Sequence, residues 1–386
     1  MIKEWTDKHI QGDPVIWFIV LALSILSILV VYSATGTLAY AQMEGNTEYY
    51  LIKHSMFMFL SLFAMWVAHK IDYRYYAKLS RLALWLCVPL LFITWKFGLN
   101  INEASRWITI PVINQAFQPS DLAKFALIVT LAAMLAKRQD EIDNIKESLI
   151  PMLLWIGLIC GLIAMTNLST SILVFLTCMV VMFIGRVPLK YLLLLVAIGA
   201  IAGAIAMSVG QRGKTAISRI ETFFESGEIP FQAEQSYIAI AKGGLIRFAP
   251  GGSTQRNFLP HPYSDFIYAI VIEEYGLLGG AFVLFLYLAL LYRGTRVVAT
   301  SERTYGGLLS AGLSFTLVLQ AMVNMGVAVG LGPITGLTLP LVSMGGTSQL
   351  FTGIALGIIL SVSKGETEEL SSTRQGNKFK KEFQLT

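Results

Sequence analysis

The residues best suited to chemistry gather around Asp265, in a polar run that covers residues 232–272. The run includes Gln235, Ser253 and Gln255, and Asp265 stands where it meets a long apolar stretch. Asp265 can act in two ways. It can cap the following helix, which stabilises a helix by about 1 kcal/mol. It can instead serve as a general base, because desolvation at a membrane boundary suits a carboxylate to accept a proton.

A second group of charged residues surrounds a predicted helix start at Pro119. Asp121 and Lys124 are three residues apart, so they share a helical face. They can form an internal ion pair, or Lys124 can face a cavity and bind an anion. A lysine inside a membrane span is costly, which favours the functional role. Arg106 and Trp107 either anchor the membrane interface or bind a phosphate through the guanidinium.

Two further pairs lie in apolar stretches. Glu273 and Glu274 are adjacent and point about 100° apart on a helix, so at most one shares a face with Asp265. Both are costly in lipid, so at least one should face the interior of the bundle or a partner. Gln320 and Asn324 are four residues apart, and we expect them to join helices rather than line a cavity.

The segment 332–348 contains two prolines and four glycines near a membrane rim, which predicts irregular backbone. Such backbone must be buried in protein or line a wet cavity. Ser343, Gly345 and Ser348 offer hydroxyl and N–H groups that can hold an anion.

Apolar stretches must position these residues, because 55% of the chain is hydrophobic and only 14% is charged. Soluble domains carry about 25% charged residues. Stretches near the length of a bilayer crossing lie at 14–34, 52–69, 81–97, 119–136, 149–166, 168–185, 189–209, 266–292, 307–330 and 348–363. The chain is therefore predicted to be an all-α polytopic membrane protein with about ten transmembrane helices. The polar run at 166–170 is either a tight turn or a break in one long element.

Lysine and arginine concentrate in alternate short loops, which places those loops and both termini in the cytoplasm. The expected organisation is a cytoplasmic N-terminus at 1–13, a membrane domain at 14–363 and a disordered cytoplasmic tail at 364–386. Residues 210–265 form a large, structureless extracytoplasmic loop between spans seven and eight, and such loops are usually functional. No zinc-protease, Walker or nucleic-acid motif is present, and no internal repeat favours a transporter.

Three motifs in this chain resemble the SEDS family (shape, elongation, division and sporulation), which includes FtsW and RodA. They are Arg106-Trp107 with the run to Lys124, the stretch from Phe258 to Glu274, and the stretch from Pro333 to Ser348. The runs at 253–256 and 338–340 look more like FtsW than RodA. The chain departs from the family pattern at Asp121, where Glu is usual, and at Asn167 and Ser169, where Asp and Gly are common. His261-Pro262 replaces a commonly acidic segment.

The resemblance implies a peptidoglycan glycosyltransferase, a hexosyltransferase that polymerises lipid II during cell division or elongation. It implies that Asp265 deprotonates the acceptor 4-hydroxyl while undecaprenyl pyrophosphate leaves. The expected substrate-binding residues are Arg106, Trp107, Asp121, Lys124, Gln235, Ser253, Gln255, Glu273, Ser343, Gly345 and Ser348. Basic groups or a divalent cation, Mg²⁺ or Mn²⁺, can stabilise the departing pyrophosphate.

The family further implies a bacterial cytoplasmic (inner) membrane location with an extracytoplasmic active site. The implied partners are a class B penicillin-binding protein and other division or elongation proteins, with no nucleic acid. A flippase for lipid-linked precursors is an alternative, but it needs charges at the midplane, and here they cluster near the outer rim. A non-catalytic scaffold leaves the cost of Lys124 and Glu273 unexplained.

Overall fold

The computed structural model describes residues 11–42, 45–101, 104–110, 115–141, 144–209, 213–224, 229–301 and 303–383. The helices are α2 (Pro14–Ala34), α3 (Gly36–Gln42), α4 (Thr47–Lys70), α5 (Tyr73–Phe97), α6 (Pro119–Lys137), α7 (Ile150–Ala164), α8 (Leu168–Ile184), α9 (Leu189–Val209), α10 (Gly213–Phe224), α11 (Phe231–Gly243), α12 (Ile267–Thr300), α13 (Thr304–Ala328) and α14 (Thr347–Phe383). The strands are β1 (Leu99–Ile101), β2 (Ala104–Ile110) and β3 (Gln115–Phe117). Single helical turns lie at Gln139–Glu141, Ile145–Leu149 and Gln255–Asn257.

Within these ranges, eight helices are long and apolar enough to cross a membrane: α2, α4, α5, α6, α7 with the turn before it, α12, α13 and α14. The apolar helix α8 has 17 residues, and the apolar part of α9 covers residues 189–204, so both are shorter than this length. Each of the ten apolar stretches therefore lies on a helix, and the predicted all-α membrane fold is confirmed. The count of ten crossings stays a prediction.

Capping residues set where several helices begin. Asp13 accepts a hydrogen bond from the Val15 N–H (2.9 Å), and Pro14 occupies the first helical position of α2. Asn167 caps α8 by accepting from the Thr170 N–H (3.2 Å). Because α7 ends at Ala164 and α8 begins at Leu168, the polar run at 166–170 is a tight turn between two helices.

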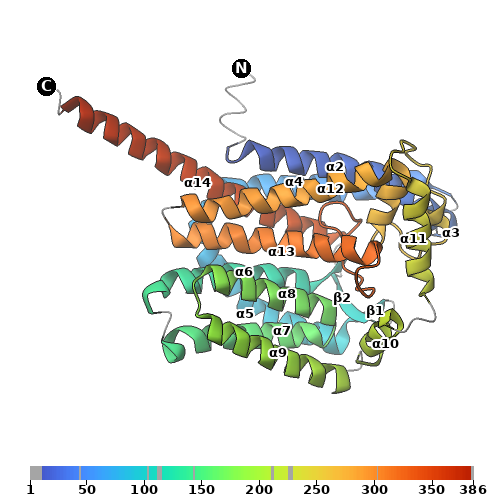
Figure 1. Cartoon of the computed structure of the whole chain (residues 1–386), viewed down its shortest axis with the longest axis horizontal. Helices are drawn as coiled ribbons and strands as arrows, with labels where there is room; N and C mark the ends of the chain where they lie inside the picture. Colours follow the sequence, from blue (N-terminus) through green and yellow to red (C-terminus); the bar gives the residue numbers. More distant parts are fainter. Residues whose placement is uncertain are drawn as a thin grey trace.

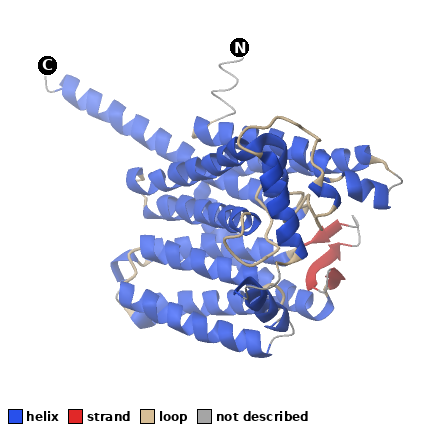
Figure 2. Ribbon diagram, turned by 45° about the vertical axis from the view of Figure 1, so that its right-hand side comes forward, coloured by secondary structure: helices blue, strands red, loops and turns tan. Residues whose placement is uncertain are grey.

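The membrane-length helices lie side by side, and β1, β2, α3, α10 and α11 gather at one end of the bundle (Figure 1). Figure 2 shows the small sheet beyond the helix ends, next to the loops of that same end. Helices α6 and α13 are the most buried candidate spans. Both therefore run through the centre of the bundle and can carry polar groups to a site at its end.

The sheet was not expected from the sequence. It is antiparallel with the order β1-β2-β3, and Ile108 of β2 pairs with Phe117 of β3. Its strands of three to seven residues are too short to show a clear alternating pattern. The sheet nevertheless fixes the direction of Arg106 and Trp107, which both lie on β2.

The prediction of a structureless loop at 210–265 is wrong, because this segment contains α10, α11 and the turn at Gln255–Asn257. Helix α11 buries the small residues Ala233, Ser236, Ala239 and Gly243, which carry little apolar signal. A Cβ on Gly243 would lie only 2.1 Å from the Ile272 carbonyl oxygen. Close packing against α12 therefore depends on side chains that hydropathy does not detect.

The predicted eighth span is interrupted. Gly276 has φ 70° and ψ 179°, which divides α12 into a short helix at 267–275 and a long one at 277–300. Residues 244–249 supply the missing backbone partners: Leu277 N–H donates to the Gly244 carbonyl (2.9 Å), and Ala249 N–H donates to the Glu274 carbonyl (2.9 Å). A left-handed glycine between two apolar runs leaves no mark on the hydropathy pattern.

The prediction that the tail after Lys364 is disordered is also wrong. Helix α14 continues to Phe383 and projects from the bundle (Figure 1). A helix that is already nucleated inside a bundle extends at little further cost per residue.

Candidate active site

A cavity of about 630 Å³ opens where the sheet, α6 and α13 meet the irregular segments near Asp265 and Gly336. Seven predicted site residues line it: Arg106, Trp107, Asp121, Lys124, Asp265, Gly345 and Ser348. Four basic side chains (Lys53, Arg106, Lys124 and Arg219) and two carboxylates (Asp121 and Asp265) also face it. This excess of positive charge suits an anionic ligand.

Asp265 points into the cavity instead of capping α12. The N-cap position of α12 is Phe266, and no side chain caps that helix. One carboxylate oxygen of Asp265 accepts a hydrogen bond from the Ser264 hydroxyl (2.8 Å). The side chain of Asn324 donates to the Asp265 backbone carbonyl (2.8 Å), which fixes this turn against α13. The geometry thus favours the general-base alternative.

Asp265 and Arg106 converge on Gly336. This glycine has φ 67°, and a Cβ built on it would lie 3.4 Å from Asp265 Oδ2 and 3.9 Å from Arg106 Nη1. The backbone conformation favours glycine, and the absent side chain leaves the space between the carboxylate and the guanidinium open. A group that fills this space meets a carboxylate and a guanidinium together.

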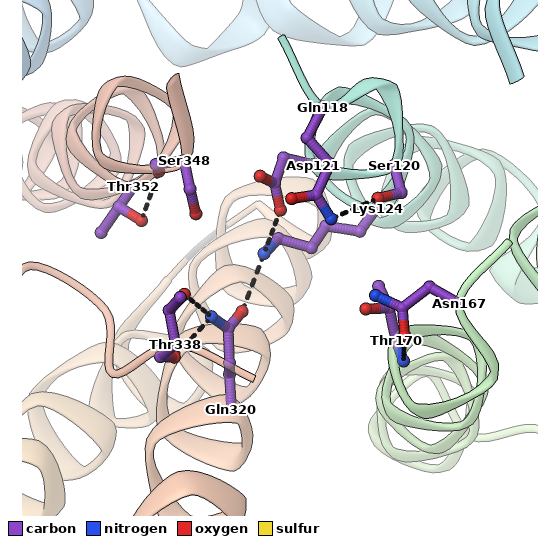
Figure 3. A network of polar contacts seen from close by, with 10 residues as sticks. All are labelled: Gln118, Ser120, Asp121, Lys124, Asn167, Thr170, Gln320, Thr338, Ser348 and Thr352. Carbon is purple, nitrogen blue, oxygen red and sulfur yellow. Dashed lines mark hydrogen bonds and ion pairs between the residues drawn. The ribbon is translucent and has the colours of Figure 1, made fainter. Parts of the chain in front are cut away.

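Lys124 is held at the back of the cavity by partners from two helices (Figure 3). Its ammonium donates to Asp121 Oδ1 (3.1 Å) and to Gln320 Oε1 (2.8 Å), and its side chain is 3% exposed. The Gln320 amide donates in turn to the Thr338 carbonyl (2.8 Å). An ammonium has three N–H donors, so one remains for a ligand. The internal ion pair is therefore present and Lys124 also lines the cavity, while its binding of an anion stays a prediction.

Asp121 has a second oxygen, Oδ2, that is buried and has no hydrogen-bond partner among the described atoms. A buried unpaired carboxylate oxygen is costly. Figure 3 shows Asn167 with Thr170 on one side of this network and Ser348 with Thr352 on the other. A ligand with hydroxyl groups can therefore donate a hydrogen bond to Asp121 Oδ2 in these polar surroundings.

Five predicted substrate-binding residues lie outside the cavity lining: Gln235, Ser253, Gln255, Glu273 and Ser343. Glu273 is fully buried and accepts hydrogen bonds from the Ser253 hydroxyl, the Thr254 N–H (3.0 Å) and the Gln255 N–H (3.3 Å). The Ser343 hydroxyl donates to the Ser264 carbonyl (2.6 Å), one residue before Asp265. Gln235 lies half-buried on α11, and its neighbour Gln232 lines the cavity instead. Through these hydrogen bonds Glu273 holds residues 253–255, and Ser343 holds the residue before Asp265. Both therefore position neighbouring segments.

Glu274 also faces the interior, as expected for at least one member of the acidic pair. It is fully buried, accepts from the Ser33 hydroxyl of α2 and from the Ser253 N–H (3.3 Å), and lies near Arg256. Arg256 donates to the Ser33 carbonyl (3.0 Å). The two glutamates thus fasten the turn at 253–256 to α12 and α2.

The favoured interpretation of Gln320 and Asn324 as groups that join helices was incomplete. Gln320 lines the cavity, and Asn324 donates to the backbone carbonyls of Asp265 (2.8 Å) and Leu337 (2.7 Å). Both amides hold irregular segments that carry site residues. Their spacing was visible in the sequence, but their partners lie up to 196 positions away.

Sequence reasoning missed Arg219, Lys53, His54 and Tyr263, which all line the cavity. The Tyr263 hydroxyl shares a hydrogen bond with His261 Nδ1 (3.0 Å). Burial raises the pKa of Tyr263 above its ordinary value, and nearby Tyr50 and Asp265 add to the rise. The phenol therefore stays neutral beside Asp265. Its place in the run at 232–272, two residues before Asp265, was the available signal.

The expectation of a divalent cation finds no ready-made ligand set. The described ranges contain no cluster of three His, Cys, Asp or Glu side chains that could hold a metal ion. Asp121 and Asp265 are the carboxylates of the cavity lining, and Asp121 already pairs with Lys124.

Several known proteins are related to this chain in sequence. Residues 13–368 match the model of the FtsW/RodA/SpoVE family, described as cell cycle proteins. Stage V sporulation protein E of Bacillus subtilis is 30% identical over 371 residues, which cover 93% of this chain and 99% of that protein. A probable peptidoglycan glycosyltransferase FtsW of Geobacter sulfurreducens is 32% identical over 359 residues, 91% of this chain and 95% of the relative.

Solved structures share the fold. The rod shape determining protein RodA of Thermus thermophilus aligns with a TM-score of 0.67 and 26% identity, over 92% of this chain and 97% of that chain. A chain from a peptidoglycan synthase complex aligns with a TM-score of 0.72 and 24% identity, over 92% and 98%. The family match spans nearly all of the sequence and every residue that lines the cavity, so the chain belongs to the FtsW/RodA/SpoVE family of cell cycle proteins.

Proposed function

We propose that this chain is a peptidoglycan glycosyltransferase that polymerises lipid II in the bacterial cytoplasmic membrane. The observation that carries the proposal is the convergence of the Asp265 carboxylate and the Arg106 guanidinium on the open space over Gly336. A glycosyltransferase needs a base for the acceptor hydroxyl and positive charge for the leaving diphosphate. The cavity supplies both.

In the proposed reaction, Asp265 accepts the proton of the acceptor sugar 4-hydroxyl. The oxygen attacks the anomeric carbon of the donor, a new C–O bond forms, and the bond to the diphosphate breaks. Arg106 and Lys124 stabilise the negative charge that develops on the departing polyprenyl diphosphate. Trp107, Asp121, Gly345 and Ser348 line the same cavity and contact the sugars.

The proposed orientation places the cavity on the extracytoplasmic side, with residues 1–13 and 364–386 in the cytoplasm. The proposed partner is a class B penicillin-binding protein, a transpeptidase that cross-links the new strands. One similar structure comes from a complex in which polymerization and crosslinking are coordinated, which supports this pairing. Failure of the folded chain to bind or respond to its transpeptidase would refute the partner assignment.

The test is polymerisation of fluorescent lipid II by the purified chain. Asp265→Ala and Asp265→Asn are both expected to lower the rate by at least about 100-fold, because general-base catalysis contributes about 10²–10⁴-fold. A helix cap would tolerate Asn well. The matched control is Glu234→Gln, an exposed carboxylate of α11 outside the cavity lining, which should polymerise at the normal rate. Undiminished polymer from a folded Asp265→Asn variant would refute the role, and lipid translocation without polymer would favour the flippase alternative.

A further inference from the structure

A second, smaller cavity of about 220 Å³ opens between α8, α10 and α13. We name it the apolar groove, because most of its lining is hydrophobic: Leu168, Ile172, Leu173, Leu176, Ile220, Leu319, Val323, Pro333, Ile334 and Leu337, with Arg106, Ser169, Thr215, Arg219 and Thr335. A concave apolar surface with a few polar groups at one end is typical of a site for an amphipathic ligand.

The apolar groove is open to the lipid-facing surface of the bundle. Ile172 and Leu176 lie one helical turn apart on α8, and they are 50% and 49% exposed. Ile220 of α10 borders the same groove and is 39% exposed. In a bilayer these side chains meet acyl chains, so a lipid tail can enter the groove without crossing water.

Two arginines join the apolar groove to the active-site cavity. Arg106 and Arg219 line both, together with Ile334, Thr335 and Leu337. Arg219 donates to the Ile334 carbonyl (3.1 Å), and Arg106 donates to the Thr166 carbonyl (3.4 Å). Backbone anchors of this kind hold the guanidinium planes at the junction. Guanidinium groups bind phosphate oxygens in a bidentate manner.

We propose that the apolar groove holds the first isoprene units of the donor lipid, with its diphosphate between Arg106 and Arg219. This assignment rests on the proposed function and adds to it a route from the bilayer to the base. The donor fits better than the acceptor because its diphosphate is the leaving group. Arg106 lies near the open space over Gly336 that Asp265 also faces, so a diphosphate bound there places its sugar beside the base.

Photocrosslinking gives a test that does not require catalysis. A photoreactive residue at Leu176 is compared with one at Leu154, which is 67% exposed on α7 and lies outside the groove. The probe is labelled undecaprenyl diphosphate in phosphatidylcholine nanodiscs. Labelling is expected at position 176, displaced by unlabelled polyprenyl diphosphate and not by inorganic pyrophosphate. It should weaken at least about tenfold in an Arg219→Gln background, a loss of about 1.4 kcal/mol.

Equal labelling at both positions, or labelling at 176 that polyprenyl diphosphate does not displace, would mean that the groove holds bulk lipid only, and the proposal would be overturned. Displacement by inorganic pyrophosphate alone would overturn it too, because the tail would then contribute nothing. These outcomes leave the polymerisation test untouched.

A kinetic measurement separates the groove from the proposed function. Ile172→Trp fills the groove and should raise the KM for long-tailed lipid II about tenfold, with a much smaller effect on a short-tailed analogue. Leu154→Trp should change neither. If the wild-type protein polymerises lipid II and Ile172→Trp raises the KM for both substrates equally, the groove assignment fails while the proposed function stands. If wild-type chain makes no polymer, the proposed function fails, and crosslinking alone decides the groove.

Discussion

The Asp265 carboxylate and the Arg106 guanidinium lie within 4 Å of one point, the position that a side chain on Gly336 would occupy. Gly336→Ala is therefore expected to place a methyl group between base and cation and to lower kcat about 100-fold, the loss that a misplacement of about 1 Å can cause. Steady-state polymerisation measures the effect.

The control for backbone strain is Gly251→Ala. Gly251 also has a positive φ (75°), but nothing lies within 4 Å of its added Cβ. Both substitutions should cost about 1–2 kcal/mol of stability, and only Gly336→Ala should affect kcat. Equal losses of activity in the two variants would argue against a special role for the space over Gly336.

Lys124→Met is expected to destabilise the fold by about 3–5 kcal/mol, because it leaves the Asp121 carboxylate buried without its cation. Thermal unfolding in detergent measures the loss. The double variant Asp121→Asn with Lys124→Met should regain much of the stability and remain inactive. If the double variant regains activity as well as stability, the role of Lys124 is structural only.

Asn324→Ala should lower kcat by about tenfold or more and stability by about 1–3 kcal/mol, because one buried and one partly buried carbonyl lose their donor and the turn at Asp265 loosens. Ser310→Ala is the matched control on the same helix, since its buried hydroxyl donates to the Gly294 carbonyl (2.9 Å) far from the cavity. Ser310→Ala should lower the stability and leave kcat unchanged. A kcat loss in Ser310→Ala as large as in Asn324→Ala would contradict the positioning role.

Glu273→Gln distinguishes substrate binding from positioning. The carboxylate collects several donors from residues 253–255, so its loss should lower the Tm while the KM for lipid II stays within about twofold of wild type. A much larger rise in KM, with the fold intact, would restore the contact with substrate that the sequence resemblance implied.

Sequence reasoning located the helices well, because the bilayer imposes a length and hydropathy that single segments display. It also paired Asp121 with Lys124, since a spacing of three residues acts within one helix. It could not find Gln320 as the second partner of Lys124, because contacts between helices depend on the packed bundle. The break at Gly276 and the open space over Gly336 escaped notice for a related reason: a glycine's φ is set by its neighbours in space.

The backbone bonds at the break in α12 also restrict how this protein can vary. Residues 244–249 donate to and accept from the chain at Glu274, Leu277 and Leu278, so they replace the ladder that the break removes. A backbone group left unpaired in lipid costs several kcal/mol. Insertion or deletion of one residue between Gly244 and Ala249 would shift every one of these pairs, and the short helix behind Asp265 would shift with them. This loop should therefore tolerate changes of residue type far better than changes of length.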